Sequence, residues 1–204
     1  MKHIKEFISE AVISWRGQGL EEFRESVYEH RLPIFLQDLI TIGADHNIEI
    51  VDYPTFYAEL PEEHKSSAPP RGVAAFATVN PDSFRPRVVV NVPRVDARLF
   101  EYIIHMLKHE MVHVGQWNRR AVHRAGPDPT DRAAYFSDKD EVMAFAHSIA
   151  DQLIAMGIRR IQDAPKHFNR LPLYLDIKKN VDLKTLKRYH KYIYLYLEEE
   201  LADK

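Results

Sequence analysis

The segment from Asp96 to Trp117 constrains the fold of this chain more than any other part of the sequence. Glycine and proline are absent between Asp96 and Val114, and the apolar residues recur mostly at spacings of three, four and seven. Such spacings place apolar side chains on one face of an α-helix. These positions are Leu99, Ile103, Ile104, Leu107, Met111, Val112 and Val114. We therefore expect a long amphipathic helix that packs one face against a core.

Within this predicted helix, His109, Glu110 and His113 form an HExxH motif. Residues four positions apart share a helix face, so the two histidines can direct their imidazoles to one point. Histidines with this spacing are typical zinc ligands, and the glutamate lies where a general base for water activation is needed. The alternative is an amphipathic helix that carries two histidines at its surface or in its core, because the chain has 11 histidines in 204 residues.

Two runs rich in β-branched residues precede the predicted helix, at residues 72–79 and 87–92. Asn80, Pro81, Asp82 and Pro86 lie between or beside them and favour a turn. By themselves these runs are equally compatible with an ordinary hairpin over a helical core. We therefore expect a small β-sheet directly before the HExxH helix.

A catalytic zinc generally needs a third protein ligand, and Glu141 is the best candidate. The spacing of Ser137 and Asp140 is typical of a helix start, which predicts a second helix to about Met156 with Glu141 in its first turn. Small Ala144 would let this helix approach the HExxH helix closely. Its apolar stripe comprises Val142, Phe145, Ile149, Leu153 and Ile154.

Other residues compete with Glu141 for the third ligand position. His105 lies one turn before His109, but it is about 12 Å from His113 along the helix axis, at about 1.5 Å per residue. Metal–nitrogen bonds of about 2 Å then make it hard for all three histidines to reach one ion. We expect His105 beside the site or at the surface. Four further candidates stay open, namely His123, His147, Asp138 and Asp140.

A short sheet that runs into an HExxH helix, followed by an acidic ligand on a second helix, resembles the gluzincin branch of the zincin metallopeptidases. In that family an edge strand borders the cleft and can pair with an extended peptide substrate. The resemblance implies hydrolysis of peptide bonds that depends on Zn²⁺, with His109, His113 and Glu141 as metal ligands and Glu110 as the general base. The segment between His113 and Glu141 is longer than in the tightest members of that branch, so it must form a loop.

Peptide hydrolysis also needs a group that stabilises the developing oxyanion beyond the metal. Tyr135 or a histidine such as His123 could supply it, and the sequence does not choose between them. Tyr135 is also interpretable as an aromatic residue of the core.

The first eleven residues, Met1 to Ala11, resemble the capsid-targeting leader of internal head proteins in T-even-type bacteriophages. Such leaders begin with Met-Lys, carry Glu-Phe-Ile and end in an aliphatic-x-Glu site that the prohead protease cuts. Here Ile8-Ser9-Glu10 matches that site. The resemblance implies a cleavable leader at residues 1–10, phage head assembly and the prohead protease as partners, and a location in the virion interior or the host cytoplasm. The alternative is a plain amphipathic helix.

Composition agrees with a water-soluble enzyme. A chain of 204 residues with 45% hydrophobic residues can bury one substantial core, so we expect a single domain over residues 11–204. Cysteine is absent, which excludes disulfides and thiolate metal ligands. The net charge of −2 gives no overall attraction to nucleic acid or to an anionic membrane. No apolar stretch is long enough for a membrane span or a secretory signal.

The remaining pattern predicts an α+β fold dominated by helices. We expect helices at residues 20–30 and 34–42, a strand at 48–51 and a last helix from Asp182 to about Leu201. Residues 54–72, which contain four prolines, and residues 159–172 are expected to be irregular connections.

Two classes of function are compatible with these features. The first is a zinc metallopeptidase that acts on a peptide or protein substrate and is packaged in a phage head. The second is a catalytically silent internal virion protein, or a binding module, on a zincin scaffold. Glu110 favours the enzyme, because a purely structural zinc site would not need a base there.

Overall fold

The computed structural model describes residues 19–62, 65, 73–80, 82–83, 85–120 and 130–202, with the side chains of 117–120 left aside. The described chain forms two compact units, residues 19–114 and residues 115–202, and their boundary falls between Val114 and Gly115. The expectation of one domain over residues 11–204 stays a prediction. The proposed leader, residues 1–10, lies outside the described residues.

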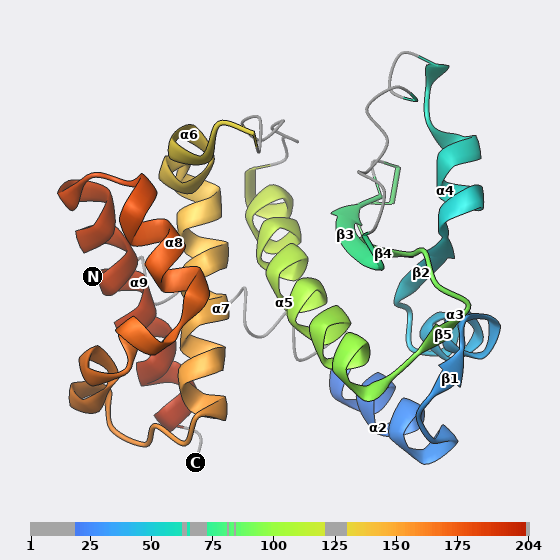
Figure 1. Ribbon diagram of the computed structural model, residues 1–204, viewed down its shortest axis with the longest axis horizontal. Helices are drawn as coiled ribbons and strands as arrows, with labels where there is room; N and C mark the ends of the chain where they lie inside the picture. The colour runs from blue at the N-terminus through green and yellow to red at the C-terminus, as the bar shows by residue number, and fades with distance from the viewer. Residues whose placement is uncertain are drawn as a thin grey trace. The chain divides into compact units, whose positions relative to one another are not determined.

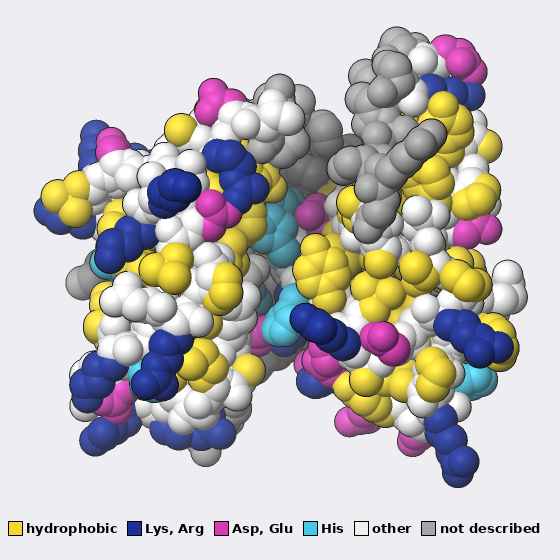
Figure 2. All heavy atoms as spheres, in the orientation of Figure 1, with side chains coloured by type: hydrophobic (Ala, Val, Ile, Leu, Met, Phe, Trp, Pro, Cys, Tyr) yellow, Lys and Arg dark blue, Asp and Glu magenta, His cyan; other side chains and the backbone are white. Residues whose placement is uncertain are grey.

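The first unit combines helices with short strands (Figure 1). Its helices are α2 (Leu20–His30), α3 (Leu36–Asp45), α4 (Tyr53–Glu59) and the first part of α5 (Ala97–Arg120). Its strands are β1 (Ile34–Phe35), β2 (Glu49–Asp52), β3 (Ala75–Val79), β4 (Pro86–Val90) and β5 (Arg94–Val95). On the face shown in Figure 2, hydrophobic, basic and acidic side chains all reach the surface.

The main sheet has the strand order β2-β4-β3. Strand β2 runs parallel to β4 with Ile50 opposite Val88, and β3 runs antiparallel to β4 with Ala77 opposite Val88. Strands β1 and β5 form a separate antiparallel pair. Among the described strands, β3 pairs with β4 alone and is therefore an edge strand of the sheet that precedes α5.

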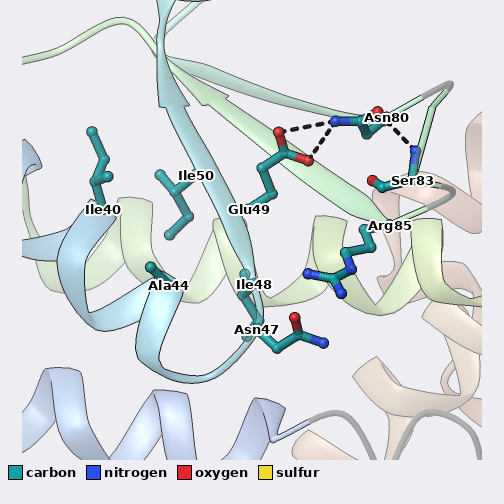
Figure 3. A pocket seen from close by; sticks show the side chains of 9 residues that line it. All are labelled: Ile40, Ala44, Asn47, Ile48, Glu49, Ile50, Asn80, Ser83 and Arg85. Carbon is teal, nitrogen blue, oxygen red and sulfur yellow. Dashed lines mark hydrogen bonds between the residues drawn. The ribbon is translucent and has the colours of Figure 1, made fainter.

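Charged and polar side chains tie β2 to its neighbours at one end of this sheet. The largely buried Arg87 on β4 forms ion pairs with Glu49 on β2 and, at 2.7 Å, with Glu59 on α4. Asn80 donates through Nδ2 to both oxygens of Glu49, at 3.0 and 2.9 Å, beside a pocket of about 380 Å³ (Figure 3). A buried guanidinium is stable here because two carboxylates compensate its charge.

The core of the first unit lies between the sheet and the helices α2, α3 and α5. It contains Phe23, Leu39, Val88, Phe100, Ile103 and Leu107, all fully buried. The apolar stripe of the predicted HExxH helix is therefore confirmed, and Asp96 begins the helix by accepting the Leu99 N–H at 2.8 Å. Helix α3 approaches β2 closely at Gly43, where an added Cβ would lie 2.9 Å from the Ile48 carbonyl oxygen.

The second unit is helical in its described residues. It contains the end of α5, α6 (Arg132–Ser137), α7 (Lys139–Ala155), α8 (Pro172–Asn180) and α9 (Leu183–Ala202). Two short 3₁₀ helices, η2 (Ile161–Lys166) and η3 (Phe168–Arg170), occupy the expected connection. Helices α7 and α9 lie side by side (Figure 1) and bury Ile149, Leu153, Tyr189 and Ile193.

Several local expectations were wrong. Pro54 does not prevent a helix, because it lies in the first turn of α4, where Asp52 caps the helix through the Thr55 N–H at 2.7 Å. Ile34 and Phe35 pair with β5 before α3 begins. Asp138, rather than Ser137, caps α7 by accepting the Asp140 N–H at 2.8 Å. Helix α8 was not expected.

The helix-dominated α+β class and the small sheet before the HExxH helix are confirmed. The zincin-like identity of the fold stays a prediction. Within the described residues, no helix combines the length and the apolar character that a membrane span requires.

Candidate metal centre

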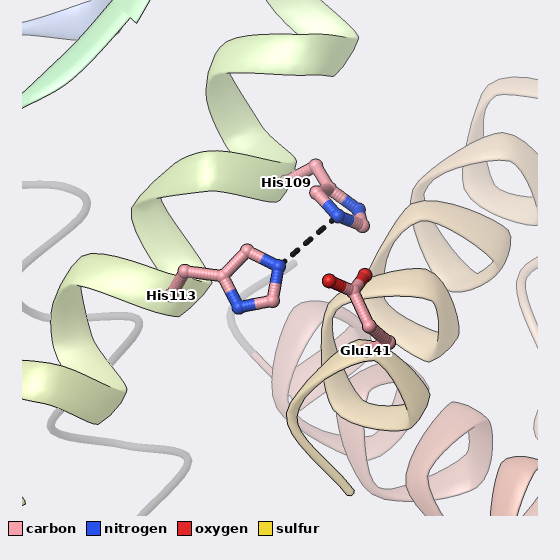
Figure 4. Close-up of side chains that lie close together, drawn as sticks. All are labelled: His109, His113 and Glu141. Atoms are coloured by element: carbon pink, nitrogen blue, oxygen red, sulfur yellow. Dashed lines mark hydrogen bonds between the residues drawn. The ribbon is translucent and has the colours of Figure 1, made fainter. Parts of the chain in front are cut away.

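His109 and His113 project from the same side of α5 toward a common point (Figure 4). Their Nε2 atoms lie 3.2 Å apart. Tetrahedral zinc, with zinc–nitrogen bonds of about 2.0–2.1 Å, places two ligand nitrogens about 3.3 Å from each other. The two imidazoles therefore already have the separation that one zinc ion needs.

Glu141 supplies a third ligand atom from the first turn of α7 (Figure 4). The ligand atoms of His109, His113 and Glu141 all lie within 4.8 Å of one another. Two imidazoles and one carboxylate form a donor set found in catalytic zinc sites, where a fourth position stays open. The three residues predicted as ligands come together in the structure and could hold a metal ion.

Gln116 holds the beginning of α7 to the end of α5. Its side chain is fully buried, and Nε2 donates to the backbone oxygen of Asp140 at 3.2 Å. Gln116 follows His113 by about one helical turn on α5, and Asp140 directly precedes Glu141. The Gln116 amide therefore fixes the backbone next to Glu141, and it does so from a position one helical turn after His113.

Tyr189 on α9 supports the same region. Its hydroxyl donates to the Phe136 carbonyl oxygen at 2.9 Å. Burial raises the pKa of Tyr189 strongly, and the nearby charges of Glu141, Tyr135 and Asp138 add to this effect. The phenol is therefore a neutral donor that satisfies a carbonyl near the end of α6, where helix geometry leaves carbonyls without partners.

Neither Gln116 nor Tyr189 was assigned a polar role from the sequence. The spacing of Gln116 from His113 could have indicated a supporting amide on the same helix face. Tyr189 is fully buried, but its acceptor is a backbone atom that no sequence pattern marks.

Glu110 and Tyr135 are the two residues predicted to act in catalysis. Glu110 lies half-buried on α5 between the two histidines of the motif. Tyr135 lies half-buried on α6, and its ring packs edge-on against Phe145 with centroids 5.6 Å apart. This contact agrees with a packing role for Tyr135, and the catalytic roles of both residues stay predictions.

The rival ligands take other positions in the described residues. His105 is not part of the cluster of possible metal ligands that contains His109 and His113. His147 is buried on α7 with its ring centroid 4.9 Å from that of Tyr196 on α9. Asp138 caps α7 with its carboxylate, and Asp140 is buried with its carbonyl bound to Gln116. His123 and the loop expected at residues 125–129 lie outside the described residues.

Comparison with known proteins adds no family assignment, because no protein-family model, no curated protein and no solved structure matches the chain. The function is therefore inferred from the site itself.

Proposed function

We propose that this protein is a zinc-dependent metallopeptidase with a gluzincin-like site. One observation carries the proposal: the ligand atoms of His109, His113 and Glu141 lie within 4.8 Å of one another in an HExxH context. The donor set fits zinc, and the glutamate inside the motif has no part in that set.

Each residue has a defined role in the proposed reaction. His109, His113 and Glu141 hold the ion, which would supply Lewis acidity to a water molecule and to a peptide carbonyl. Glu110 takes the proton from the attacking water and returns it to the departing amine. Tyr135 donates a hydrogen bond to the oxygen on which negative charge develops.

Strand β3 supports a peptide as the substrate. It lies in the same unit as His109 and is an edge strand, antiparallel to β4. A sheet edge offers backbone donors and acceptors to an extended chain, which adds as a further strand. A strand added antiparallel to β3 would have its carboxyl end beside Ala75, where β3 begins.

The leader-like segment supports a proposal about where this peptidase acts. The match of residues 1–11 to phage head leaders supports the proposal that the peptidase is packaged in a phage particle and acts inside the virion or the host cell.

Substitution of the general base tests the proposed function. The Glu110→Gln protein should keep its zinc and lose peptide hydrolysis by roughly a hundredfold or more, because amides do not accept protons at neutral pH. Glu25→Gln, at an exposed position on α2, is the matched control. Hydrolysis is measured on a mixed peptide library by mass spectrometry, and zinc by elemental analysis.

Two results would contradict this mechanism. Equal hydrolysis by the wild-type and Glu110→Gln proteins would remove Glu110 from catalysis. Loss of zinc from the variant would make Glu110 a metal ligand.

A further inference from the structure

A groove of about 440 Å³ lies beside the start of α5 in the first unit. Its lining includes Ala74 and Val92 at the strand ends, Arg94 on β5, and Arg98, Leu99 and Tyr102 on α5. We call this feature the α5 groove. Tyr102 keeps 52% of its surface exposed, so the groove presents an aromatic ring to solvent.

The α5 groove lies on the same side of the helix as the candidate metal ligands. Arg98, Tyr102 and His109 are spaced by four and seven residues, and these spacings place all three side chains on one helix face. Tyr102 precedes His109 by two turns, which is about 10 Å along the axis. A strand advances about 3.3 Å per residue, so this distance corresponds to about three residues of extended peptide.

The charged lining of the groove is two arginines, Arg94 and Arg98, and one aspartate, so basic side chains outnumber acidic ones. Arg98 is exposed and has no ion-pair partner among the described residues. The guanidinium of Arg94 lies over the Phe35 ring, 4.3 Å from its centroid, and has no carboxylate partner in the described part of the chain. The carboxylate of Asp96, also in the groove, accepts the Leu99 N–H and caps α5.

We propose that the α5 groove binds an acidic side chain of the peptide substrate, about three residues beyond the cleaved bond on its carboxyl side. This inference rests on the proposed peptidase function. The side of the bond follows from antiparallel addition of the peptide to β3, which is the more stable and more common pairing. A peptide in that direction has its carboxyl end near Ala74 and Ala75, where β3 begins. Guanidinium groups match carboxylates in charge and geometry, and the exposed Tyr102 ring packs on the stem of the same side chain.

A binding experiment tests the groove without depending on hydrolysis. The probes are two fluorescein-labelled extended peptides, one alternating Glu with Val and the other alternating Gln with Val. Fluorescence anisotropy with the zinc-loaded Glu110→Gln protein should give roughly tenfold tighter binding of the Glu peptide.

Reversal of the charge at Arg98 tests whether the α5 groove causes this preference for the Glu peptide. Arg98→Glu should weaken binding of the Glu peptide until it no longer binds more tightly than the Gln peptide. The variant should fold normally, because an acidic residue in the first turn of a helix is compatible with the helix dipole. Arg85→Glu makes the same change of net charge at an exposed arginine that lines the pocket of Figure 3, and it should keep the preference.

Hydrolysis of a peptide library by the wild-type protein supplies the second measurement. Asp and Glu should be enriched at about the third residue after the cleaved bond, and Arg98→Glu should abolish the enrichment. Intact acid-selective binding without any hydrolysis would disprove the peptidase and keep the groove as a peptide-binding site.

Four results would overturn the inference itself. These are equal binding of both peptides, no measurable binding of either, an equal loss of preference in Arg85→Glu, and tighter binding of an oligothymidylate than of the Glu peptide.

Discussion

Two buried polar side chains, Gln116 and Tyr189, organise the surroundings of the candidate metal centre without being ligands. Each donates to a backbone carbonyl that belongs to another helix, at 3.2 Å from Gln116 and 2.9 Å from Tyr189. A buried polar group that lacks a partner is costly, so such bonds specify how helices meet. Together they hold the segment that contains Phe136, Asp140 and Glu141.

Removal of the Tyr189 hydroxyl should destabilise the protein. Tyr189→Phe leaves the Phe136 carbonyl without its donor and should lower the free energy of unfolding by about 1 kcal/mol. Urea denaturation followed by circular dichroism measures the change. Tyr192→Phe, at a buried tyrosine of the same helix with no hydroxyl hydrogen bond in the described structure, should have a smaller effect. Equal effects of the two substitutions would contradict the role given to the Tyr189 bond.

The proximity of the three candidate ligands was predictable from the sequence, but the side chains that support them were not. His109 and His113 follow from helix periodicity, and Glu141 follows from ligand chemistry and a helix start nearby. The partners of Gln116 and Tyr189 are backbone atoms brought close by tertiary packing. No residue pattern marks such atoms.

At the scale of elements, long amphipathic segments were predicted well and short ones were not. Helices α5 and α9 have apolar stripes over many turns, and the strands β3 and β4 are rich in β-branched residues. Helices α4 and α8 begin with proline in the first turn; α4 lies in a segment that was expected to be irregular, and α8 was not expected. The two residues of β1 depend entirely on pairing with β5, which sequence spacing does not reveal.

A stack of aromatic rings joins η3, α8 and α9 in the second unit. The three rings contact one another, with the Phe168 centroid 4.7 Å from Tyr174 and 5.2 Å from His190, and the Tyr174 and His190 centroids 5.8 Å apart. The Tyr174 hydroxyl lies 2.7 Å from His190 Nε2, where the neutral imidazole can accept a hydrogen bond from it. Burial, and then the charge of Lys178, lower the pKa of His190.

This stack should make stability depend on pH. Because the folded protein holds His190 with a pKa below the ordinary value of 6.5, the unfolded chain takes up a proton first as the pH falls. The contribution of His190 is therefore fully present above pH 6.5 and is lost as the pH falls through the lower folded value. The difference in unfolding free energy between wild type and His190→Asn should shrink from pH 7.5 to pH 5.

Thermal or urea unfolding at several pH values measures this difference. His30→Asn, at an exposed histidine of α2, controls for the loss of one imidazole. A difference for His190→Asn that stays constant or grows toward pH 5 would contradict the argument.

At the scale of the whole molecule, the proposed leader can be tested independently of the metal centre. If residues 1–10 are a phage head leader, the protein in particles should begin at Ala11, because the cut follows Glu10. Removal of these residues should leave zinc binding and stability nearly unchanged, since a leader must be detachable by its protease. N-terminal sequencing of protein from purified particles is the measurement. An intact Met1 in the particles, or loss of folding on deletion, would favour the alternative that this segment is a structural helix.

The candidate metal ligands lie on two different helices, α5 and α7, so zinc binding reports on both the fold and the proposed function. Elemental analysis of the purified protein should find about one zinc per chain. His109→Ala and Glu141→Ala should each lose most of it, whereas His30→Ala, at an exposed histidine on α2, should keep it. Circular dichroism checks that each variant is folded. Zinc that stays undiminished in the folded His109→Ala or Glu141→Ala protein would contradict the assignment of the metal centre.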